Sequence, residues 1–407
     1  MIILVINCGS SSVKYQLIKA DEEELICSGI VERIGAITSI VKHDLPGEKT
    51  KKITKVLENH TAALNEIMDF LLDGEDPVLQ DRNEIKAVGH RVVHGGETFK
   101  DSVLIDDDVI AAIEQSVDLA PLHNPPNLKG IRAAQKSLSE IPHVAVFDTA
   151  FHHSIPPEAY LYAIPNRLYR RYKIRKYGFH GTSHYYVSRR YYQLKERSRK
   201  GSRVISCHLG NGASICAIKD GYSVDTSMGF TPVSGLIMGT RTGDIDPSII
   251  FYLVEKEELP LKSIHDLINR HSGLLGLSGY AADMRELLQE VDKGDYRCKQ
   301  AVEAFCYRVK QYIGNYMAVL NGADSIIFTG GIGENSSRIR KMIMSDLSFA
   351  GVEIDLEANE NAGFGKETKI STPNSKVDVW VIPTNEELVI AKDAAKIAEA
   401  SLQSPWI

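Results

Sequence analysis

Two stretches of the chain share one pattern: ILVINCGSSSVKYQLI at residues 3–18 and RVISCHLGNGASICAIK at residues 203–219. Each has a β-rich run, a turn of small residues and a second β-rich run, which is typical of a β-hairpin. Half of the chain separates them. We interpret them as the beginnings of two similar halves, whose turns would present backbone N–H groups to anions across a cleft. Chance similarity is the alternative, because hairpins with Gly and Ser turns are common.

Strand-like runs alternate with helical periodicity along the rest of the chain, which predicts an α/β protein. Strands are expected at 2–6, 13–18, 86–93, 144–147, 204–208, 213–218, 325–329 and 377–382. Helices are expected at 61–72, 107–117, 127–138, 183–195, 247–254, 283–291, 296–320 and 337–344.

The composition predicts a globular protein of two or three domains, at roughly 150 residues per domain. Its 407 residues include 47 Lys and Arg against 53 Asp and Glu, and the net charge of -6 argues against a dedicated nucleic-acid binder. The six cysteines have no C-x-x-C pair or zinc spacing, which favours reduced thiols. The apolar run at 1–6 is too short for a signal peptide, and no run approaches the roughly 18 apolar residues of a membrane helix. We therefore expect a cytoplasmic protein without nucleic-acid or membrane partners.

A glycine-rich segment, FTGGIGENS at 328–336, lies between an expected strand and an expected helix. Glycines at such a turn let the backbone approach a ligand, and the N-terminus of the following helix favours negative charge. The segment matches neither the dinucleotide-binding fingerprint nor the Walker A pattern, because no lysine follows the glycines. It therefore argues against a Rossmann dehydrogenase and a P-loop kinase.

Nine of the thirteen histidines lie between residues 90 and 208, and several stand beside Gly, Asn or Pro. Side chains in such loops are often placed for function, although a single histidine is more commonly structural. His180 and His184 also have the spacing of zinc ligands, but no glutamate follows His180 as a zinc protease motif requires. Zinc stays an alternative to a role in recognition.

Arg241 stands at the centre of DTSMGFTPVSGLIMGTRTGDIDP, residues 225–247, a long segment without clear periodicity. Such a loop is often functional, and its arginine would suit a carboxylate or phosphate, with Arg91 as a second one. A purely structural arginine that binds loop carbonyls is the alternative. Residues 167–203 carry thirteen Lys and Arg against one Glu. We expect a solvated helix face near an anion site there, with an RNA surface as the alternative.

Six further runs complete the pattern: NCGSSSVKY, GHRVVHGG, LHNPPN, FDTAFH, YGFHGTSH and PTNEELVIA. Together with the segments above, they make the chain resemble the acetate kinase family from residue 7 to 391. The resemblance implies the fold of the acetate and sugar kinase, Hsp70 and actin superfamily. That fold is α/β, with two duplicated ribonuclease H-like domains (β-β-β-α-β-α-β-α cores) and an active-site cleft between them. Domain I would span 1–150 plus 383–407, and domain II, for nucleotide binding and dimerisation, would span 151–382.

The resemblance also implies an activity: reversible, direct in-line transfer of the ATP γ-phosphoryl group to acetate, giving acetyl phosphate and ADP. Mg²⁺, or alternatively Mn²⁺, would be required, and the protein would be a homodimer. A propionate kinase or another short-chain acyl kinase would differ only in pocket volume. A nucleotide-switched binding protein like actin or Hsp70 is the alternative from a different class.

The family motifs imply roles for individual residues. Arg91 and Arg241 would bind acetate and the phosphoryl group, and His180 would donate a hydrogen bond to the latter. Asn7 and Glu386 would hold the metal, although the adjacent Glu387 could serve instead. Asp148 has an acid/base role in the family. We expect it to orient an arginine or the metal's waters, because acetate is already ionised at pH 7.

The remaining implied residues form two sets. The acetate methyl group would be enclosed by Val93, Leu122, Phe179 and Pro232. The nucleotide would be bound by Ser10, Ser12, Lys14, His208, Leu209, Gly210, Asn211, Gly212, Asp283, Met284, Arg285, Gly331, Ile332, Gly333, Glu334 and Asn335.

Overall fold

The computed structural model describes residues 1–73, 77–121 and 123–403. It has two sheets with helices, so the predicted α/β class is confirmed. The chain divides into two compact units. Unit 1 consists of Met1–Ala150 and Asn385–Ile407, and unit 2 consists of Phe151–Thr384.

Unit 1 contains one sheet with the strand order β5-β4-β3-β2-β1-β6-β8-β7. Its strands are β1 (Ile2–Cys8), β2 (Ser12–Lys19), β3 (Glu24–Glu32), β4 (Ser39–Asp44), β5 (Lys51–Lys55), β6 (Ile85–Val92), β7 (Val103–Leu104) and β8 (His143–Phe147). Its helices are α1 (His60–Asp73), α2 (Asp107–Gln115), α3 (Asn124–Ser137) and α15 (Glu386–Gln403). Strand β1 pairs antiparallel with β2 and parallel with β6, which in turn pairs parallel with β8.

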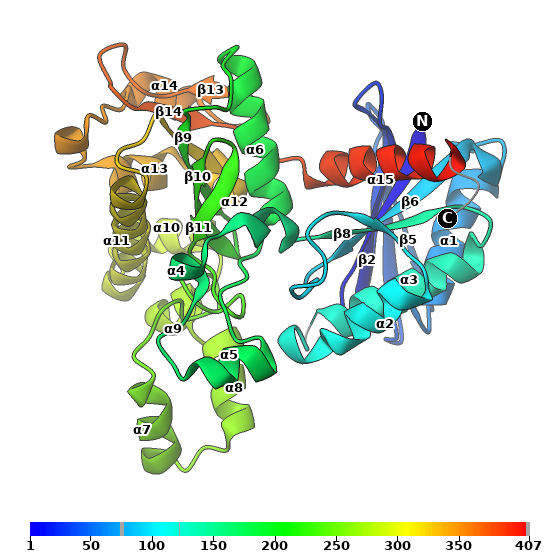
Figure 1. The fold of residues 1–407 in the computed structure, drawn as a ribbon, viewed down its shortest axis with the longest axis horizontal. Helices are drawn as coiled ribbons and strands as arrows, with labels where there is room; N and C mark the ends of the chain where they lie inside the picture. Colours follow the sequence, from blue (N-terminus) through cyan, green and yellow to red (C-terminus); the bar gives the residue numbers. More distant parts are fainter. Residues whose placement is uncertain (74–76, 122, 404–407) are drawn as a thin grey trace. The chain divides into compact units, whose positions relative to one another are not determined.

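Helices cover both faces of this sheet: α15 lies on one face, and α1 and α3 lie on the other (Figure 1). Two glycines permit the close approach. A Cβ atom on Gly89 in β6 would lie 2.6 Å from the Cγ2 atom of Ile390 in α15. A Cβ atom on Gly130 in α3 would lie 2.2 Å from the Sγ atom of Cys8 in β1. Real Cβ atoms are not found at such distances, so side chains here would push the helices off the strands that carry the candidate site.

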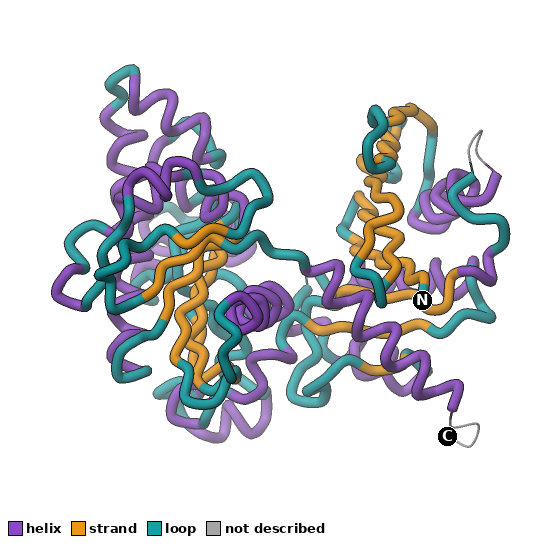
Figure 2. Tube along the Cα trace, turned by 90° about the horizontal axis from the view of Figure 1, so that it is seen from above, coloured by secondary structure: helices purple, strands orange, loops and turns teal. Residues whose placement is uncertain are grey.

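Unit 2 contains the second sheet, with the strand order β11-β10-β9-β12-β14-β13. Its strands are β9 (Arg203–Leu209), β10 (Ala213–Lys219), β11 (Tyr222–Thr226), β12 (Ser325–Thr329), β13 (Thr368–Lys369) and β14 (Asp378–Val381). Its helices are α4 (Pro157–Tyr160), α5 (Asn166–Tyr172), α6 (Gly181–Leu194), α7 (Ser248–Lys256), α8 (Leu261–Arg270), α9 (Gly273–Ser278), α10 (Met284–Asp292), α11 (Tyr296–Val319), α12 (Gly330–Asn335), α13 (Ser337–Met344) and α14 (Leu356–Asn361). In each unit the strands lie among helices (Figure 2).

The two sheets share a core of five strands. In unit 1 its order is β3-β2-β1-β6-β8, and in unit 2 it is β11-β10-β9-β12-β14. In both cores the first three strands pair antiparallel and the last three pair parallel. The hairpins β1–β2 and β9–β10, which carry the two similar stretches of sequence, therefore occupy equivalent positions. The duplicated core inferred from them is confirmed.

The structure differs from the expected elements in two respects. The glycine-rich segment was predicted to be a turn, but residues 330–335 form the short helix α12. Gly330 has a φ of 76°, a left-handed conformation that glycine adopts at little cost and that allows β12 to lead directly into this helix. The prediction also omitted β3, β4, β5, β7, β11 and β13, and the helices α4, α5, α8, α9 and α14. No helix of the described ranges is long and apolar enough to cross a membrane.

Candidate active site

In unit 1, three of the predicted site residues lie at the carboxyl ends of three neighbouring parallel strands. Asn7 is near the end of β1, Arg91 is near the end of β6, and Asp148 directly follows β8. A fourth predicted site residue of unit 1, Glu386, is the first residue of helix α15. Ligands of open α/β sheets bind outside the carboxyl ends of the strands, so the topology places these side chains where a site is expected.

Arg91 and Asp148 form a bidentate ion pair. The Nε atom of Arg91 donates to Oδ1 of Asp148 at 3.0 Å, and its Nη2 atom donates to Oδ2 at 2.6 Å. The Asp148 side chain is almost fully buried, whereas 22% of the Arg91 side chain is exposed. Two parallel hydrogen bonds fix the plane of a guanidinium group. Asp148 therefore holds Arg91 in one orientation, while part of the Arg91 side chain stays exposed.

The charges around this pair are unevenly balanced. Burial alone would lower the pKa of Arg91, but Asp148 and Glu386 more than compensate, so its pKa is raised and it stays charged. Burial, followed by Asp148 and Glu387, raises the pKa of Glu386 to about 7, against the opposing effects of Arg91 and Lys14. Three carboxyl groups thus face two cationic side chains. An additional cation would favour the ionised form of Glu386.

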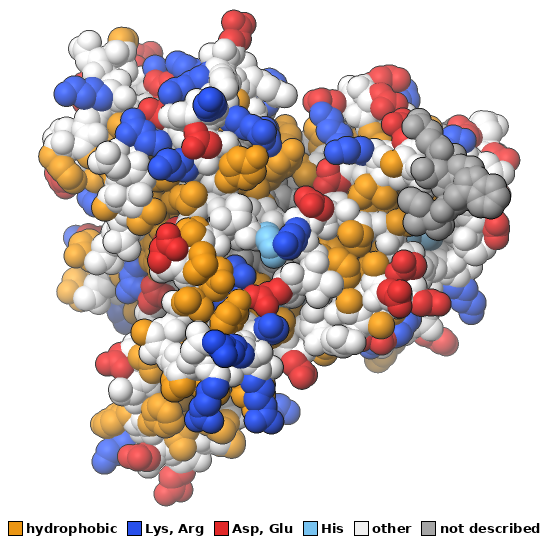
Figure 3. Space-filling model, viewed as in Figure 1, with side chains coloured by type: hydrophobic (Ala, Val, Ile, Leu, Met, Phe, Trp, Pro, Cys, Tyr) orange, Lys and Arg blue, Asp and Glu red, His pale blue; other side chains and the backbone are white. Residues whose placement is uncertain are grey.

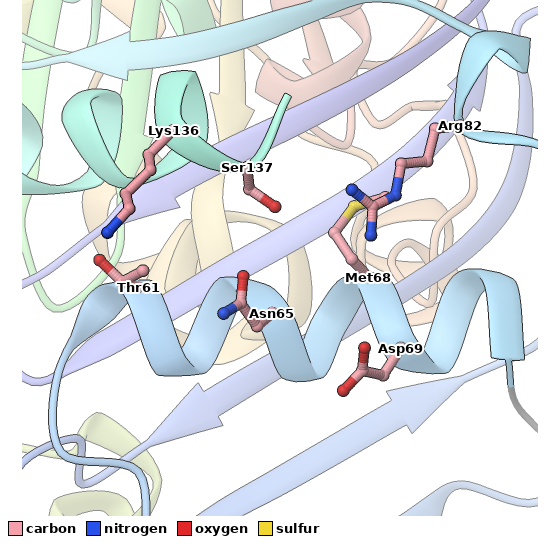
Figure 4. Close-up of a pocket in the computed structure, with 7 residues that line it drawn as sticks. All are labelled: Thr61, Asn65, Met68, Asp69, Arg82, Lys136 and Ser137. Atoms are coloured by element: carbon pink, nitrogen blue, oxygen red, sulfur yellow. The ribbon is translucent and has the colours of Figure 1, made fainter. Parts of the chain in front are cut away.

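Asn7, Lys14 and Glu387 line one pocket of ≈ 390 Å³ in unit 1. Ser10 and His60 line a second pocket of ≈ 510 Å³. The Nε2 atom of His60 lies 2.8 Å from the carbonyl oxygen of Gly9. A third pocket, between α1 and the C-terminal end of α3, contains none of the predicted residues (Figure 4). Its lining consists of Thr61, Asn65, Met68, Asp69, Arg82, Lys136 and Ser137.

In unit 2, His180 directly precedes helix α6. Its φ is 56°, in the left-handed region that non-glycine residues rarely adopt. Its Nδ1 atom lies 2.9 Å from the Oγ atom of Ser214 in β10. The ring stacks on that of His208, with 4.3 Å between the ring centroids. The backbone and two neighbours in the sheet thus determine where His180 lies.

His180 and Arg241 converge on the turn between β9 and β10. A Cβ atom on Gly212 would lie 3.4 Å from Nε2 of His180 and 3.6 Å from Nη1 of Arg241. Arg241 donates to the carbonyl oxygen of Pro232 at 3.2 Å and forms no ion pair with an acid of the described residues. Burial lowers its pKa. A half-buried guanidinium without an acidic partner among the described residues, beside a histidine nitrogen and a glycine turn, suits an anionic ligand.

Ten of the sixteen predicted nucleotide residues lie at the end of β9, on the turn that follows it and on α12. The turn 210–212 leaves β9, and α12 leaves the neighbouring strand β12. A Cβ atom on Gly210 would lie 3.9 Å from Nε2 of His208 and 4.0 Å from the backbone nitrogen of Gly331. The structure therefore brings the turn, His208 and the start of α12 together.

Several other predicted nucleotide residues have structural partners. The Glu334 carboxylate accepts from the backbone N–H groups of Gly330 at 2.8 Å and Thr384 at 3.1 Å. Asp283 caps α10 and pairs with the exposed Arg285 at 2.6 Å. The side chains of Leu209 and Met284 are buried, as is Gly333. Ile332 and Asn335 are on α12, where Asn335 donates to the carbonyl oxygen of Gly331 at 3.0 Å. Ser12 starts β2, and its carbonyl oxygen accepts from Gly9 at 2.8 Å.

The residues predicted to enclose the methyl group are divided between the units. Val93 belongs to unit 1 and is nearly buried, whereas Phe179 and Pro232 belong to unit 2. Leu122 lies outside the described residues.

The sequence prediction missed a buried amide in the segment LHNPPN. The Oδ1 atom of Asn127 accepts from the backbone N–H of Val93 at 3.1 Å, and its Nδ2 atom donates to the carbonyl oxygen of Cys8 at 3.0 Å. Asn127 thus ties the ends of β1 and β6 together. The sequence signal that could have indicated this role is the asparagine that follows two prolines, and in the structure this asparagine is on the buried face of α3.

The comparisons with known proteins agree with this arrangement. The model of the acetokinase family matches residues 2–392. The chain belongs to the acetokinase family. The predicted resemblance is confirmed, and this family accounts for a duplicated core whose glycine loops follow neither the Rossmann nor the Walker pattern.

Relatives of this acetokinase-family chain match along nearly its full length. The acetate kinase of Acetivibrio thermocellus is 51% identical over 98% of this chain and 100% of the relative, and that of Desulfitobacterium hafniense is 53% identical over the same shares. The crystal structure of the acetate kinase from Porphyromonas gingivalis has a TM-score of 0.93 at 45% identity, covering 97% of this chain and 99% of the other. A propionate kinase from Francisella tularensis has a TM-score of 0.90 at 44% identity, with the same coverage.

Proposed function

We propose that this chain is an acetate kinase, which reversibly transfers the γ-phosphoryl group of ATP to a carboxylate oxygen of acetate. The convergence of His180 and Arg241 on Gly212 is the observation that carries this proposal. Phosphoryl transfer requires donors and positive charge around the three equatorial oxygens, and it requires little covalent chemistry from the protein. A histidine, an arginine without an acidic partner among the described residues and a glycine turn supply such an environment.

In this proposal, acetate attacks the γ-phosphorus in line. A bond forms between the acetate oxygen and phosphorus, while the bond between phosphorus and the β,γ-bridging oxygen breaks and ADP leaves. Arg91, oriented by Asp148, binds the acetate carboxylate. Arg241 and His180 donate to the phosphoryl oxygens. Acetate has no proton to lose at pH 7, so Asp148 acts by orienting Arg91 and not as a base.

We further propose that the domains divide the substrates. Domain II, residues 151–382, binds the nucleotide through the 210–212 turn and α12. Domain I, residues 1–150 with 383–407, supplies Arg91, Asp148 and the side chains of the metal site, and Lys14, Ser10 and Ser12 serve the phosphates. Val93, Phe179 and Pro232 enclose the methyl group.

Magnesium fits the residues of unit 1. Asn7 and Glu386 offer hard oxygen ligands, and the raised pKa of Glu386 indicates a carboxyl group that a cation would keep ionised. The described residues contain no cluster of three or more His, Cys, Asp or Glu suited to a metal. Mg²⁺ commonly takes one or two carboxylates and completes its shell with phosphate oxygens and water. Bound Mg²⁺, or Mn²⁺, would neutralise charge on the ATP phosphates.

The metal assignment can be tested with adjacent variants. We expect Glu386→Gln to raise the Mg²⁺ concentration for half-maximal rate by about 10-fold or more, with little loss of rate at saturating Mg²⁺. Lowering the pH through about 7 should raise the Mg²⁺ requirement of the wild-type enzyme, because Glu386 becomes protonated, and this dependence should disappear in Glu386→Gln.

Glu387→Gln is the matched control, since Glu387 lines the pocket that also contains Asn7. A larger shift in Glu387→Gln than in Glu386→Gln would transfer the role to Glu387. If neither variant changed the Mg²⁺ requirement, the proposed metal site would be wrong.

The substrate can be tested by a hydroxamate assay for acyl phosphates with acetate, propionate and butyrate. We expect kcat/KM to fall by about 10- to 200-fold for each added methylene, because a small apolar pocket discriminates by that factor. Val93→Ala should reduce the preference for acetate over propionate. A higher kcat/KM for propionate would support a propionate kinase instead. ATP hydrolysis without an acyl phosphate from any acid would support an actin- or Hsp70-like function.

We propose that the protein forms a homodimer in the cytoplasm. Helix α7 has no buried residue, and Ile249, Phe251, Tyr252 and the nearby Leu261 of α8 are exposed. Hydrophobic side chains gather on this part of the surface (Figure 3). An apolar face of this kind favours association, and sedimentation equilibrium would measure it. All six cysteines are buried free thiols, which is typical of a reducing compartment.

A further inference from the structure

A chain of hydrogen bonds extends from His180 into the core of unit 2. The Oγ atom of Ser214 lies 2.9 Å from Nδ1 of His180 and 2.8 Å from Nε2 of His184. The Nδ1 atom of His184 lies 2.9 Å from the Oγ atom of Ser206. His184 is on α6 and His180 directly precedes this helix, whereas Ser214 is on β10 and Ser206 is on β9. Ser214, His184 and Ser206 are fully buried. We call these three residues the Ser214 chain.

The Ser214 chain can order its protons in two ways. A serine hydroxyl has one donor and two acceptor sites, and the two histidines are the only hydrogen-bond partners of the buried Ser214 hydroxyl among the described residues. Ser214 therefore donates to one histidine and accepts from the other. If it donates to His180, the neutral His180 and His184 both carry their proton on Nε2. If it donates to His184, both rings carry their proton on Nδ1. The geometry therefore links the tautomers of the two histidines.

His184 suits a neutral link in this chain. Burial, followed by the neighbouring His152 and His208, lowers its pKa well below the usual value. A neutral imidazole has one donor and one acceptor, and both nitrogens of His184 have a hydroxyl partner. His184 thus transmits the orientation of the Ser206 hydroxyl to Ser214 without carrying charge.

We propose that Ser214 is a positioning residue: its hydroxyl donates to Nδ1 of His180 and keeps the proton of the neutral ring on Nε2. Nε2 is the nitrogen next to Gly212 and Arg241. Phosphoryl oxygens only accept hydrogen bonds, so Nε2 must carry a proton to bind one. The proposal rests on the role given to His180 in the proposed function, and it assigns the tautomer of that residue to a hydroxyl that touches no substrate.

The direct test is the tautomer of each histidine in the full-length protein. Uniform ¹⁵N labelling of histidine and long-range ¹H–¹⁵N spectra distinguish the two neutral tautomers from the imidazolium ion. Signals of His180 and His184 are assigned with His180→Gln and His184→Asn. In the complex with Mg²⁺, acetate and a non-hydrolysable ATP analogue, we expect both rings to carry their proton on Nε2. A proton on Nδ1 of either ring, or an imidazolium at His180, would overturn the proposal.

The kinetic test uses matched serine variants. We expect Ser214→Ala to lower kcat by about 10- to 100-fold, with less than about threefold change in KM for ATP and acetate. Ser214→Thr retains the hydroxyl and should recover most of the rate. Ser223→Ala is the control, because Ser223 on β11 makes an equivalent buried bond of 2.8 Å to Nδ1 of His152. It should cost similar thermal stability and leave kcat nearly unchanged.

Other outcomes separate this proposal from the proposed function. Unchanged kcat in Ser214→Ala, with normal wild-type acetyl phosphate formation, would refute the role of Ser214 alone. Wild-type protein that formed no acyl phosphate would refute the proposed function, and the tautomer measurement would still stand. If Ser214→Ala did not fold, Ser206→Ala should show a smaller loss of kcat in the same direction, and no loss would count against the proposal.

Discussion

Replacing Arg241 by alanine is expected to lower kcat for acetyl phosphate formation by about 10³-fold, because the developing charge on the phosphoryl group loses a guanidinium aligned in advance. Arg241 is held by the carbonyl oxygen of Pro232 and has no acidic partner among the described residues, so its full charge is available to the substrate. Arg241 is half-buried and burial lowers its pKa, so the substitution removes a partly desolvated charge together with the side chain. Arg241→Ala should therefore fold and show a melting temperature at or above that of the wild type.

Arg241→Lys is the control for charge without the planar fork. We expect it to recover part of the lost rate, since a lysine supplies a point charge but not two parallel donors. A normal kcat in Arg241→Ala would exclude Arg241 from the transfer step. A loss of rate that came with a large fall in melting temperature would instead indicate a structural role.

The second large effect concerns Arg91 and Asp148, and we expect their variants to be non-additive. Arg91→Ala and Asp148→Asn should each lower kcat/KM for acetate by about 10²-fold, because misplacing a substrate-binding group costs a factor of this size. If Asp148 acts only through the bidentate pair, the double variant should be no slower than Arg91→Ala. The double variant should also be more stable than Arg91→Ala, which leaves the Asp148 carboxylate buried without the bidentate bonds from Arg91.

The pH dependence distinguishes orientation from proton transfer. With orientation, Asp148→Asn should keep the wild-type pH profile of kcat, and saturating acetate should recover much of the rate. A collapsed kcat at saturating acetate and Mg²⁺, with a changed profile and unchanged metal dependence, would show that Asp148 transfers a proton.

The sequence was sufficient for the elements with strong local patterns. The two glycine and serine hairpins predicted the duplicated core, because a β-rich run, a turn and a second β-rich run describe β1–β2 and β9–β10 directly. The strand at 325–329 and the helix at 337–344 agree with β12 and α13 residue for residue. Each has a continuous apolar or periodic pattern and a clear boundary.

Elements with mixed patterns were missed. Strand β3 has charged residues at both ends and a half-exposed face, so its sequence resembles a loop. Strand β5 is almost wholly exposed and is specified by its pairing with β4. Helix α12 begins with two glycines, which have low helix propensity. Its end is stabilised by the buried Arg340, which donates to the carbonyl oxygens of Gly333 and Glu334. Contacts with distant parts of the chain determine the secondary structure of these segments.

The candidate site shows the same division. Arg91, His180 and Arg241 stand in motifs that were recognisable from sequence alone. The Ser214 chain and the two bonds of Asn127 were not recognisable, because they join residues that only the pairing of β9 with β10 or the packing of α3 brings together. Hydrogen-bond partners from distant segments leave no local signal.

The position of α15 has a consequence for biosynthesis. Residues 1–150 form a sheet, but the helix that covers one of its faces and carries Glu386 is encoded after the whole of unit 2. At about 5–20 residues per second, a ribosome needs on the order of 10–50 seconds to travel from one segment to the other. During this interval the strands beside Gly89 lack their covering helix. The nascent chain must therefore keep this apolar surface from aggregating until residues 386–403 have been made, and the proposed metal ligand Glu386 joins the sheet of unit 1 only then.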